Sequence, residues 1–129
     1  MRRYITLPGR AVEGPFSDAV LAGDTLYISG KIGVDPATGR PPDEPEAEAR
    51  LALDWLRAVL AEAAMSTDDL VFVQVYCPDI SLFARFNAVY RSYFGADLPA
   101  RAFIGSGPLL RGGRFQITGI AVSRRFGTG

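Results

Sequence analysis

The sequence has 129 residues, of which 48% are hydrophobic, so it is long enough to form one compact domain with a substantial core. Its 14 basic and 14 acidic residues give a formal net charge of zero, and we therefore expect no nucleic-acid partner and no attraction to an anionic membrane. The absence of histidine and the single cysteine, Cys77, exclude Ser-His-Asp and Cys-His catalysis and any histidine-ligated or cysteine-cluster metal site.

Membrane-spanning and secretory segments are not expected in this chain. No apolar run approaches the roughly 20 residues that a bilayer-spanning helix needs, and no signal-type hydrophobic region follows Met1. A single cysteine cannot form an intrachain disulfide, which suits a reducing compartment. We therefore predict a cytoplasmic protein with one domain over residues 1–129, and with no metal and no cofactor.

Short apolar runs separated by turn residues predict three strands in the first part of the chain. Residues 3–7 end at a Pro-Gly turn, and residues 19–22 and 25–29 are joined by a Gly-Asp pair that suits a two-residue hairpin. Gly30 follows directly. A glycine at this place marks a bulge, a simple bend, or a close approach of another group to the backbone.

The segment from Asp43 to about Ala64 predicts one amphipathic helix. Asp43 and Glu46 have the spacing of a capping box, and a proline between them is tolerated in the first helical turn. Apolar residues recur at spacings of three and four, which gives the helix one face that can pack on a sheet. These residues are Ala49, Leu53, Leu56, Leu60 and Ala63.

The rest of the chain predicts a strand, a second helix and two further strands. Residues 70–77 are β-branched and aromatic, which is typical of a central strand covered on both faces. A helix capped by Asp79 or Ser81 follows. A strand then begins near Arg101, and residues 114–122 form the last strand.

This order of elements predicts an α+β fold with two layers, in which a mixed six-stranded sheet carries both helices on one face. The other face of the sheet has no cover within a single chain. An exposed apolar sheet face usually means association with another chain.

Arg101 is the strongest candidate for a binding residue. Pro99 has a fixed φ and biases Leu98 toward an extended conformation, so Arg101 enters its strand from a stiff approach. A guanidinium held in this way can bind a carboxylate through two hydrogen bonds. The alternatives are an ordinary surface arginine and a structural ion pair.

Six segments together resemble the Rid (YjgF) family of imine and enamine deaminases, in the same order and over nearly the whole chain. The segments are Gly14–Val20, Ile28–Gly33, Phe86–Phe94, Pro99–Ala102, Gly107–Leu109 and Phe115–Val122.

The resemblance implies a homotrimer in which the sheets form a central barrel and three ligand pockets lie in clefts between subunits. It implies that Arg101 binds the carboxylate of a small imine, enamine or keto acid, and that water then adds to the C=N carbon and ammonia leaves. The other substrate-binding residues that it implies are Phe16, Ser29, Gly30, Lys31, Phe86 and Phe103.

Three positions depart from the family pattern. Thr118 stands where we expect the family's water-activating glutamate, Phe16 replaces a phenol, and Phe103 replaces a small or sulfur-bearing residue. These changes make the site more apolar and less suited to hydrolysis. We expect water to be held by Thr118 and the carbonyl of Phe103, and a large Phe103 ring to stack on a flat substrate.

Two charged residues have open roles. Asp18 is either a substitute base or a carboxylate in a surface turn. Lys31, the only lysine, is either a second carboxylate contact, a Schiff-base amine, or simply exposed.

The sequence thus predicts a hydrolase of reactive 2-imino or enamino acids, specialised for a larger or aromatic substrate. The alternative is a non-hydrolytic member that binds, sequesters or rearranges an anionic metabolite. RNA cleavage is the weakest hypothesis, because the chain has no net positive charge and no histidine.

Overall fold

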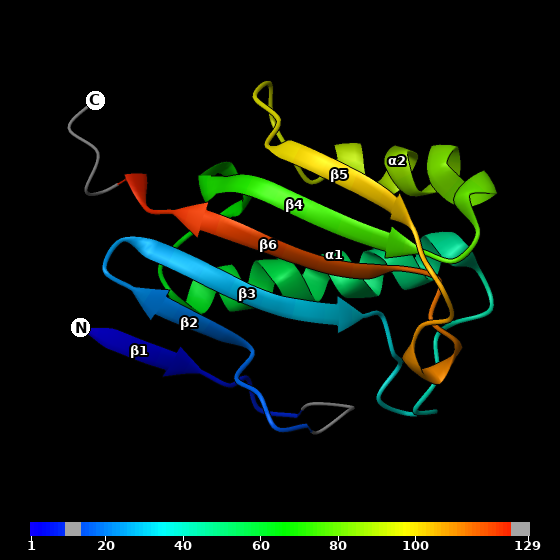
Figure 1. Cartoon of the computed structure of the whole chain (residues 1–129), viewed down its shortest axis with the longest axis horizontal. Coiled ribbons are helices and arrows are strands. Elements are labelled where there is room, and N and C mark those ends of the chain that lie inside the picture. The colour runs from blue at the N-terminus through cyan, green and yellow to red at the C-terminus, as the bar shows by residue number, and fades with distance from the viewer. Residues whose placement is uncertain (10–13, 125–129) are drawn as a thin grey trace.

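Six strands form one mixed sheet with the order β1-β2-β3-β6-β4-β5 (Figure 1). The computed structural model describes residues 1–9 and 14–124. Only β4 and β5 pair in parallel, and the other neighbours are antiparallel. The strands are β1 (Arg2–Ile5), β2 (Ala19–Ala22), β3 (Thr25–Ile32), β4 (Leu70–Cys77), β5 (Ala100–Gly105) and β6 (Gln116–Val122).

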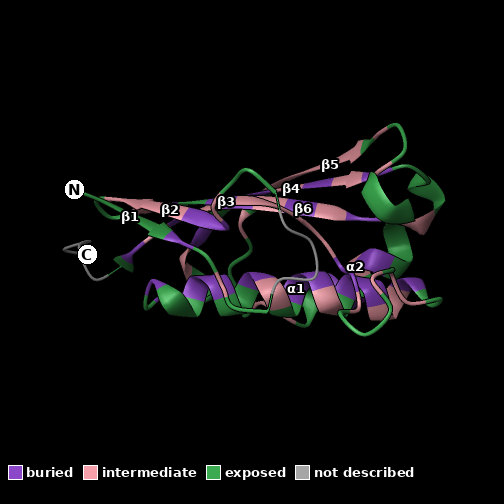
Figure 2. Cartoon of the chain, turned by 90° about the horizontal axis from the view of Figure 1, so that it is seen from below, coloured by how far each residue is buried: buried purple, intermediate pink, exposed green. Residues whose placement is uncertain are grey.

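Two helices, α1 (Pro45–Glu62) and α2 (Phe83–Arg91), cover one face of this sheet. Figure 2 shows α1 running along that face, while the opposite face carries no helix. The predicted α+β fold, with a six-stranded mixed sheet and two helices, is therefore confirmed. On the described residues, no helix is long and apolar enough to cross a membrane.

The core lies between the sheet and α1. All five apolar positions of the predicted helix face are buried, and they meet buried residues of β4 such as Val73 and Val75. Alternation along β4 leaves Phe72, Gln74 and Tyr76 partly accessible, because strand side chains point to opposite faces in turn. The predicted apolar face of the helix is therefore confirmed. The expectation that residues 70–77 are covered on both faces is wrong within one chain, because one face of β4 stays partly accessible.

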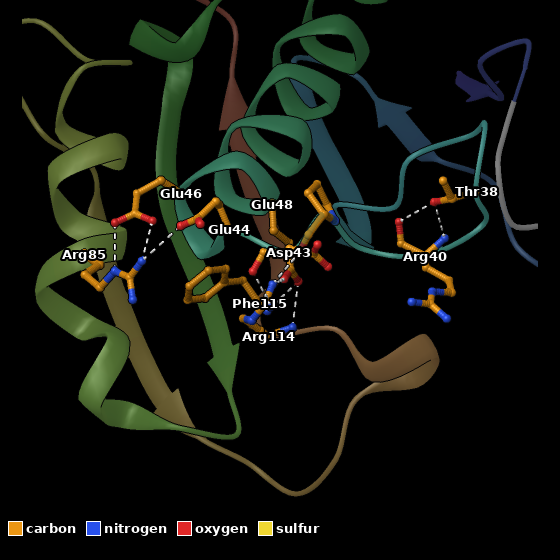
Figure 3. Close-up of polar contacts among 10 residues, drawn as sticks. Thr38, Arg40, Asp43, Glu44, Glu46, Glu48, Arg85, Arg114 and Phe115 are labelled. Atoms are coloured by element: carbon orange, nitrogen blue, oxygen red, sulfur yellow. Dashed lines mark hydrogen bonds and ion pairs between the residues drawn. The ribbon is translucent and has the colours of Figure 1, made fainter.

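The predicted capping box at the start of α1 is wrong. Glu44, not Asp43, precedes the first helical residue, and its side chain makes no capping hydrogen bond. Glu46 instead accepts two hydrogen bonds of 2.7 Å from Arg85 of α2 (Figure 3). A bidentate carboxylate–guanidinium pair is stronger than a bond to one backbone N–H, so it takes the carboxylate away from the cap.

Several elements end earlier or start later than the sequence predicts. β1 ends at Ile5 because the backbone N–H of Leu7 donates to Asp18 rather than to the sheet. α1 ends at Glu62, and Ala64 has a φ of 56°, which a right-handed helix cannot continue through. β6 begins at Gln116 because the two preceding N–H groups donate to Glu48.

Glu48 joins three parts of the chain at one buried point (Figure 3). Its side chain has no exposed surface, and its carboxylate accepts from the N–H of Arg114 at 2.6 Å and from the Arg114 guanidinium at 2.8 Å. Arg114 also donates to the carbonyls of Pro42 and Asp43. The end of β3 is close as well, because a Cβ at Gly33 would collide with the Glu48 carbonyl.

Replacing Glu48 should destabilise the fold strongly. We expect Glu48→Ala to lower the free energy of unfolding by about 3 kcal/mol, because the Arg114 guanidinium and two backbone N–H groups lose their acceptor. Urea denaturation followed by circular dichroism measures the change. Glu62→Ala, which removes an exposed partner of Arg3, is the control and should cost at most about 0.5 kcal/mol. Equal losses of unfolding free energy in the two variants would contradict the structural role of Glu48.

Candidate functional site

A cavity of about 660 Å³ lies beside the end of β3 and the start of β6. It is lined by the 14–18 segment, by the second half of β3 and by residues on either side of the turn before β6. The lining residues are Gly14, Pro15, Phe16, Asp18, Ser29, Gly30, Lys31, Ile32, Val34, Leu110, Arg111 and Gln116. We call this the β3 cavity. It brings together five of the predicted site residues: Phe16, Asp18, Ser29, Gly30 and Lys31.

The 14–18 segment is fixed to β3 by hydrogen bonds at Ser29. The Ser29 hydroxyl donates to the carbonyl of Ser17 at 2.6 Å, and the Ser29 N–H donates to the carbonyl of Asp18 at 2.9 Å. The wall that carries Phe16 is therefore held against the strand. Phe16 itself is about half exposed, with 48% of its surface accessible.

Gly30 marks a bulge in β3 and makes room for Gln116. The pairing of β3 with β6 shifts register between Ile28 and Lys31. A Cβ at Gly30 would collide with the Nε2 atom of Gln116, so the glutamine side chain lies directly across the glycine. Of the readings open from the sequence, the structure therefore supports a bulge with close approach of another group.

Gln116, not Thr118, is the residue of β6 that lines the cavity. Thr118 pairs with Gln74 of β4, and its hydroxyl donates to the carbonyl of Ile28. Sequence reasoning missed Gln116. The alternation of side chains along a strand predicts that Gln116 and Thr118 point to the same face of the sheet. Which of the two lies next to Gly30 depends on the register between β3 and β6, which the sequence does not show.

Asp18 is a buried carboxylate, so the alternative of an exposed surface turn is wrong. Only 1% of the residue is accessible, and its Oδ2 accepts from the N–H of Leu7 at 2.7 Å. This bond ties the 14–18 segment to the end of β1. Asp18 also lines the β3 cavity, and its role as a base remains a prediction.

Lys31 is partly buried rather than freely exposed. Its Nζ atom lies 5.0 Å from the centre of the Trp55 ring on α1, a cation–π distance. Lys31 and Trp55 also line a second, smaller cavity of about 290 Å³. Lys31 is therefore one of the residues that line both cavities.

Arg101 lies in a different place, on the edge strand β5, among aromatic rings. Its guanidinium carbon is 4.7 Å from the ring centre of Tyr90 and 5.6 Å from those of Phe83 and Phe103. Among the described residues no carboxylate pairs with Arg101, which argues against a structural ion pair. The residue is partly accessible, as a binding residue must be.

Phe103 and Phe86 differ in what they can contact. Phe103 is partly accessible and meets Phe83 edge-to-face, with ring centres 5.0 Å apart. Phe86 has no exposed surface and packs against Phe103 and Phe115 in the core. Phe86 therefore supports the Phe103 ring from behind and has no surface of its own to offer a substrate within one chain.

Within one chain the predicted site residues form two separate groups. The strands β3 and β5, which carry Lys31 and Arg101, are separated by β6 and β4, which corresponds to roughly 14 Å at the usual strand spacing. Neither of the two cavities described above includes Arg101. Nor do three His, Cys, Asp or Glu side chains of residues 1–9 and 14–124 gather as a metal site would require.

The fold and these two groups of residues define a small α+β domain with an arginine on an edge strand and a cavity at the bulge of β3. A sequence profile described as endoribonuclease L-PSP matches residues 8–123. The chain therefore belongs to this family, which is the Rid (YjgF) family that its motifs resemble.

Relatives and solved structures agree over nearly the whole chain. A 2-iminobutanoate/2-iminopropanoate deaminase of Capra hircus is 40% identical over 124 residues, which cover 95% of this chain and 90% of the relative. The structure of the YjgF gene product of E. coli has a TM-score of 0.87 and 32% identity, covering 95% of this chain and 99% of that one. E. coli TdcF with bound serine has a TM-score of 0.85 and 31% identity, covering 94% and 99%.

A methyl group at Gly30 should move Gln116 out of the cavity without unfolding the chain. We expect Gly30→Ala to shift the side-chain amide resonances of Gln116 in ¹⁵N NMR spectra, because the new Cβ occupies the place of Nε2. The unfolding free energy should fall by no more than about 1 kcal/mol, since a flexible side chain can move aside. Gly107→Ala, with open space around the new Cβ, is the control. Unchanged Gln116 resonances in Gly30→Ala would contradict the close approach.

Proposed function

We propose that the chain is a deaminase of 2-imino and enamino acids that releases ammonia. The observation that carries the proposal is Arg101, a partly accessible guanidinium that no described carboxylate neutralises. Such a group suits the carboxylate of a small substrate. Relatives named 2-iminobutanoate/2-iminopropanoate deaminase, at about 40% identity over more than nine-tenths of the chain, support the same activity.

We further propose that the working unit is a homotrimer with a central barrel, in which the site lies between subunits. Arg101 and the β3 cavity are too far apart in one chain to hold the same small molecule. Arg101 is on the edge strand β5, where it is open to a neighbouring chain. Tyr4 and Tyr27 are exposed and alternate with buried residues of β1 and β3, so they lie on the sheet face without helices, a surface suited to contact with another copy.

The chemistry asks little of the protein, because a protonated imine is already electrophilic. Arg101 holds the substrate carboxylate and so fixes the position of the C=N carbon. The oxygen of one water bonds to that carbon, and one proton of the water passes to the nitrogen to give a protonated carbinolamine. The C–N bond then breaks as the oxygen forms the C=O bond, and the remaining hydroxyl proton goes to the departing ammonia, so a keto acid and ammonium leave. The Phe103 carbonyl and groups of the β3 cavity would hold the water.

Gln116 limits how well the site can activate that water. Its amide can donate to or accept from a water, but it cannot remove a proton at neutral pH. Asp18 is the carboxylate among the residues that line the β3 cavity, and it is the candidate that remains for the base. Such a site suits a reactive imine, because a reactive imine needs to be oriented by the protein more than it needs a strong base.

The aromatic residues favour a substrate larger than the smallest imino acids. Phe83, Phe103 and Phe16 all expose ring surface at the two parts of the proposed site. A flat or aromatic side chain gains from stacking on such rings. We therefore propose that larger or aromatic imino acids are preferred over short aliphatic ones.

The second candidate is a protein that binds, sequesters or rearranges an anionic metabolite without hydrolysis. The observation in its favour is Gln116, because an amide in the cavity gives recognition without a strong base. RNA cleavage has less support, since the formal charge is zero and the sequence has no histidine.

Ammonia release from freshly generated imino acids tests the deaminase. An amino acid oxidase supplies the imines, and a coupled assay times ammonia in the presence and absence of the protein. Arg101→Ala should lower kcat/KM by about 10-fold to 150-fold, the value of a charge-assisted hydrogen bond pair. Arg57→Ala, which removes an exposed arginine of α1, is the matched control and should leave the rate unchanged. No acceleration by the wild-type protein with any side chain would exclude the proposal.

Gln116→Glu separates the two candidates. In a deaminase limited by water activation, this change should raise kcat by about 10-fold or more, because a positioned base is worth on the order of 100-fold to 10,000-fold. The gain should vanish below about pH 4, where a glutamate becomes protonated. Thr118→Glu restores, two residues along β6, the glutamate that the family resemblance expects, and it tests whether water is activated there instead. A gain in Thr118→Glu but not in Gln116→Glu would place the water-activating position at Thr118.

A further inference from the structure

Three buried polar atoms at the junction of α2 and β5 have no hydrogen-bond partner among the described residues. They are Asn87 Oδ1, Tyr90 Oη and Arg101 Nη1. Leaving such an atom unsatisfied costs about 1–3 kcal/mol, so native proteins rarely do so without a reason. All three belong either to the arginine of the proposed site or to α2, the helix whose rings that arginine contacts.

Two of the three atoms belong to one face of α2. Asn87 and Tyr90 lie on this face together with Phe83, because the three residues are spaced by four and three along the helix. Arg101 contacts Phe83 and Tyr90. Asn87 therefore lies on the same face of α2 as the two rings that contact the guanidinium.

The Arg101 guanidinium has an inner edge and an outer edge. Nη1 is buried, whereas the residue as a whole is partly accessible. The inner edge thus faces α2, and the outer edge is left for a ligand. The outer edge stays directed at a ligand only if contacts with α2 keep the inner edge of the guanidinium in place.

Tyr90 is suited to hold that inner edge. Its ring centre lies 4.7 Å from the guanidinium carbon, a cation–π distance at which the ring can restrict the movement of the group. The residue is 6% exposed, and burial raises the pKa of its hydroxyl to about 12 even though the positive charge of Arg101 acts in the opposite direction. The hydroxyl therefore stays protonated at physiological pH.

We propose that Tyr90 and Asn87 are positioning residues for Arg101, the ring fixing the guanidinium plane and the two polar groups fixing its inner edge through one shared buried water. The water accepts from Nη1 and donates to Asn87 Oδ1 and Tyr90 Oη, which satisfies all three atoms. The outer edge is then directed at the substrate carboxylate. This inference rests on the proposed role of Arg101 in substrate binding.

Tyr90→Phe tests the hydroxyl while keeping the ring. Binding of 2-oxobutanoate, an unreactive keto acid, is measured by calorimetry, and KM and kcat are measured with imino acids. We expect the affinity to fall by about threefold to tenfold and KM to rise by the same factor, with kcat within twofold of wild type. Asn87→Ala should give the same pattern.

Tyr93→Phe is the matched control. Tyr93 lies on the same side of the chain just after α2, and its hydroxyl donates to Asp54 at 2.7 Å rather than facing Arg101. Its loss should lower the melting temperature but leave the affinity for 2-oxobutanoate and KM unchanged. A change in affinity equal to that of Tyr90→Phe would mean that the effect is general to tyrosine hydroxyls in this region and would overturn the proposal.

A second measurement does not depend on any ligand. A guanidinium held at its inner edge rotates slowly, so ¹⁵N spectra of the wild-type protein should resolve the two Nη atoms of Arg101, and Tyr90→Phe should merge them. Identical Arg101 signals in both proteins, or an affinity within twofold of wild type, would overturn the proposal. A wild-type protein that binds 2-oxobutanoate but releases no ammonia would instead refute the deaminase and leave the positioning role tested by binding and spectra.

Discussion

The buried carboxylate of Glu48 is the interaction on which the arrangement of the β3 cavity depends. It comes from the first turn of α1, and it accepts from the backbone and the side chain of Arg114 just before β6. The entry of β6 is therefore fixed relative to the helix, and Gln116 follows within two residues. Because Arg114 also binds two carbonyls before α1, the loop, the helix and the strand are held as one unit.

The other half of the site depends on aromatic packing instead of buried charge. Arg101 rests on rings of α2 and β5, and Phe86 connects those rings to the core through Phe115. A salt bridge between Arg85 and Glu46 ties the outer side of α2 to α1. One helix therefore sets the position of the anchor, while another sets the position of the cavity. A ligand that contacts both Arg101 and the β3 cavity therefore binds to two parts of the fold whose positions are set by different helices.

Composition explains how such a site can work without histidine. An imine is electrophilic before it reaches the protein, so orientation by a cation and exclusion of competing reactions supply much of what is needed. A threonine at the position of the family's glutamate and a glutamine in the β3 cavity, together with the accessible rings of Phe16 and Phe103, shift the balance further toward recognition. The lack of a strong base is also the reason that a binding role without hydrolysis is the second candidate function.

The sequence by itself determined the secondary structure, the two-layer architecture and the family. Periods of two and of about 3.6 residues are local properties, and burial of an apolar stripe follows from them directly, as for Leu53 and Val73. The stiff approach through Pro99 likewise made Arg101 recognisable as a positioned cation. Each of these features depends on neighbours within a few residues along the chain.

Only the tertiary structure decided which side chains meet. The bulge in β3 and its register with β6 put Gln116, and not Thr118, across from Gly30. The strand order separated Arg101 from the β3 cavity, and the pairing of Glu46 with Arg85 removed the predicted helix cap. These outcomes depend on contacts between segments tens of residues apart, whose geometry is set by the packing of the whole domain and leaves no periodic signal in the sequence.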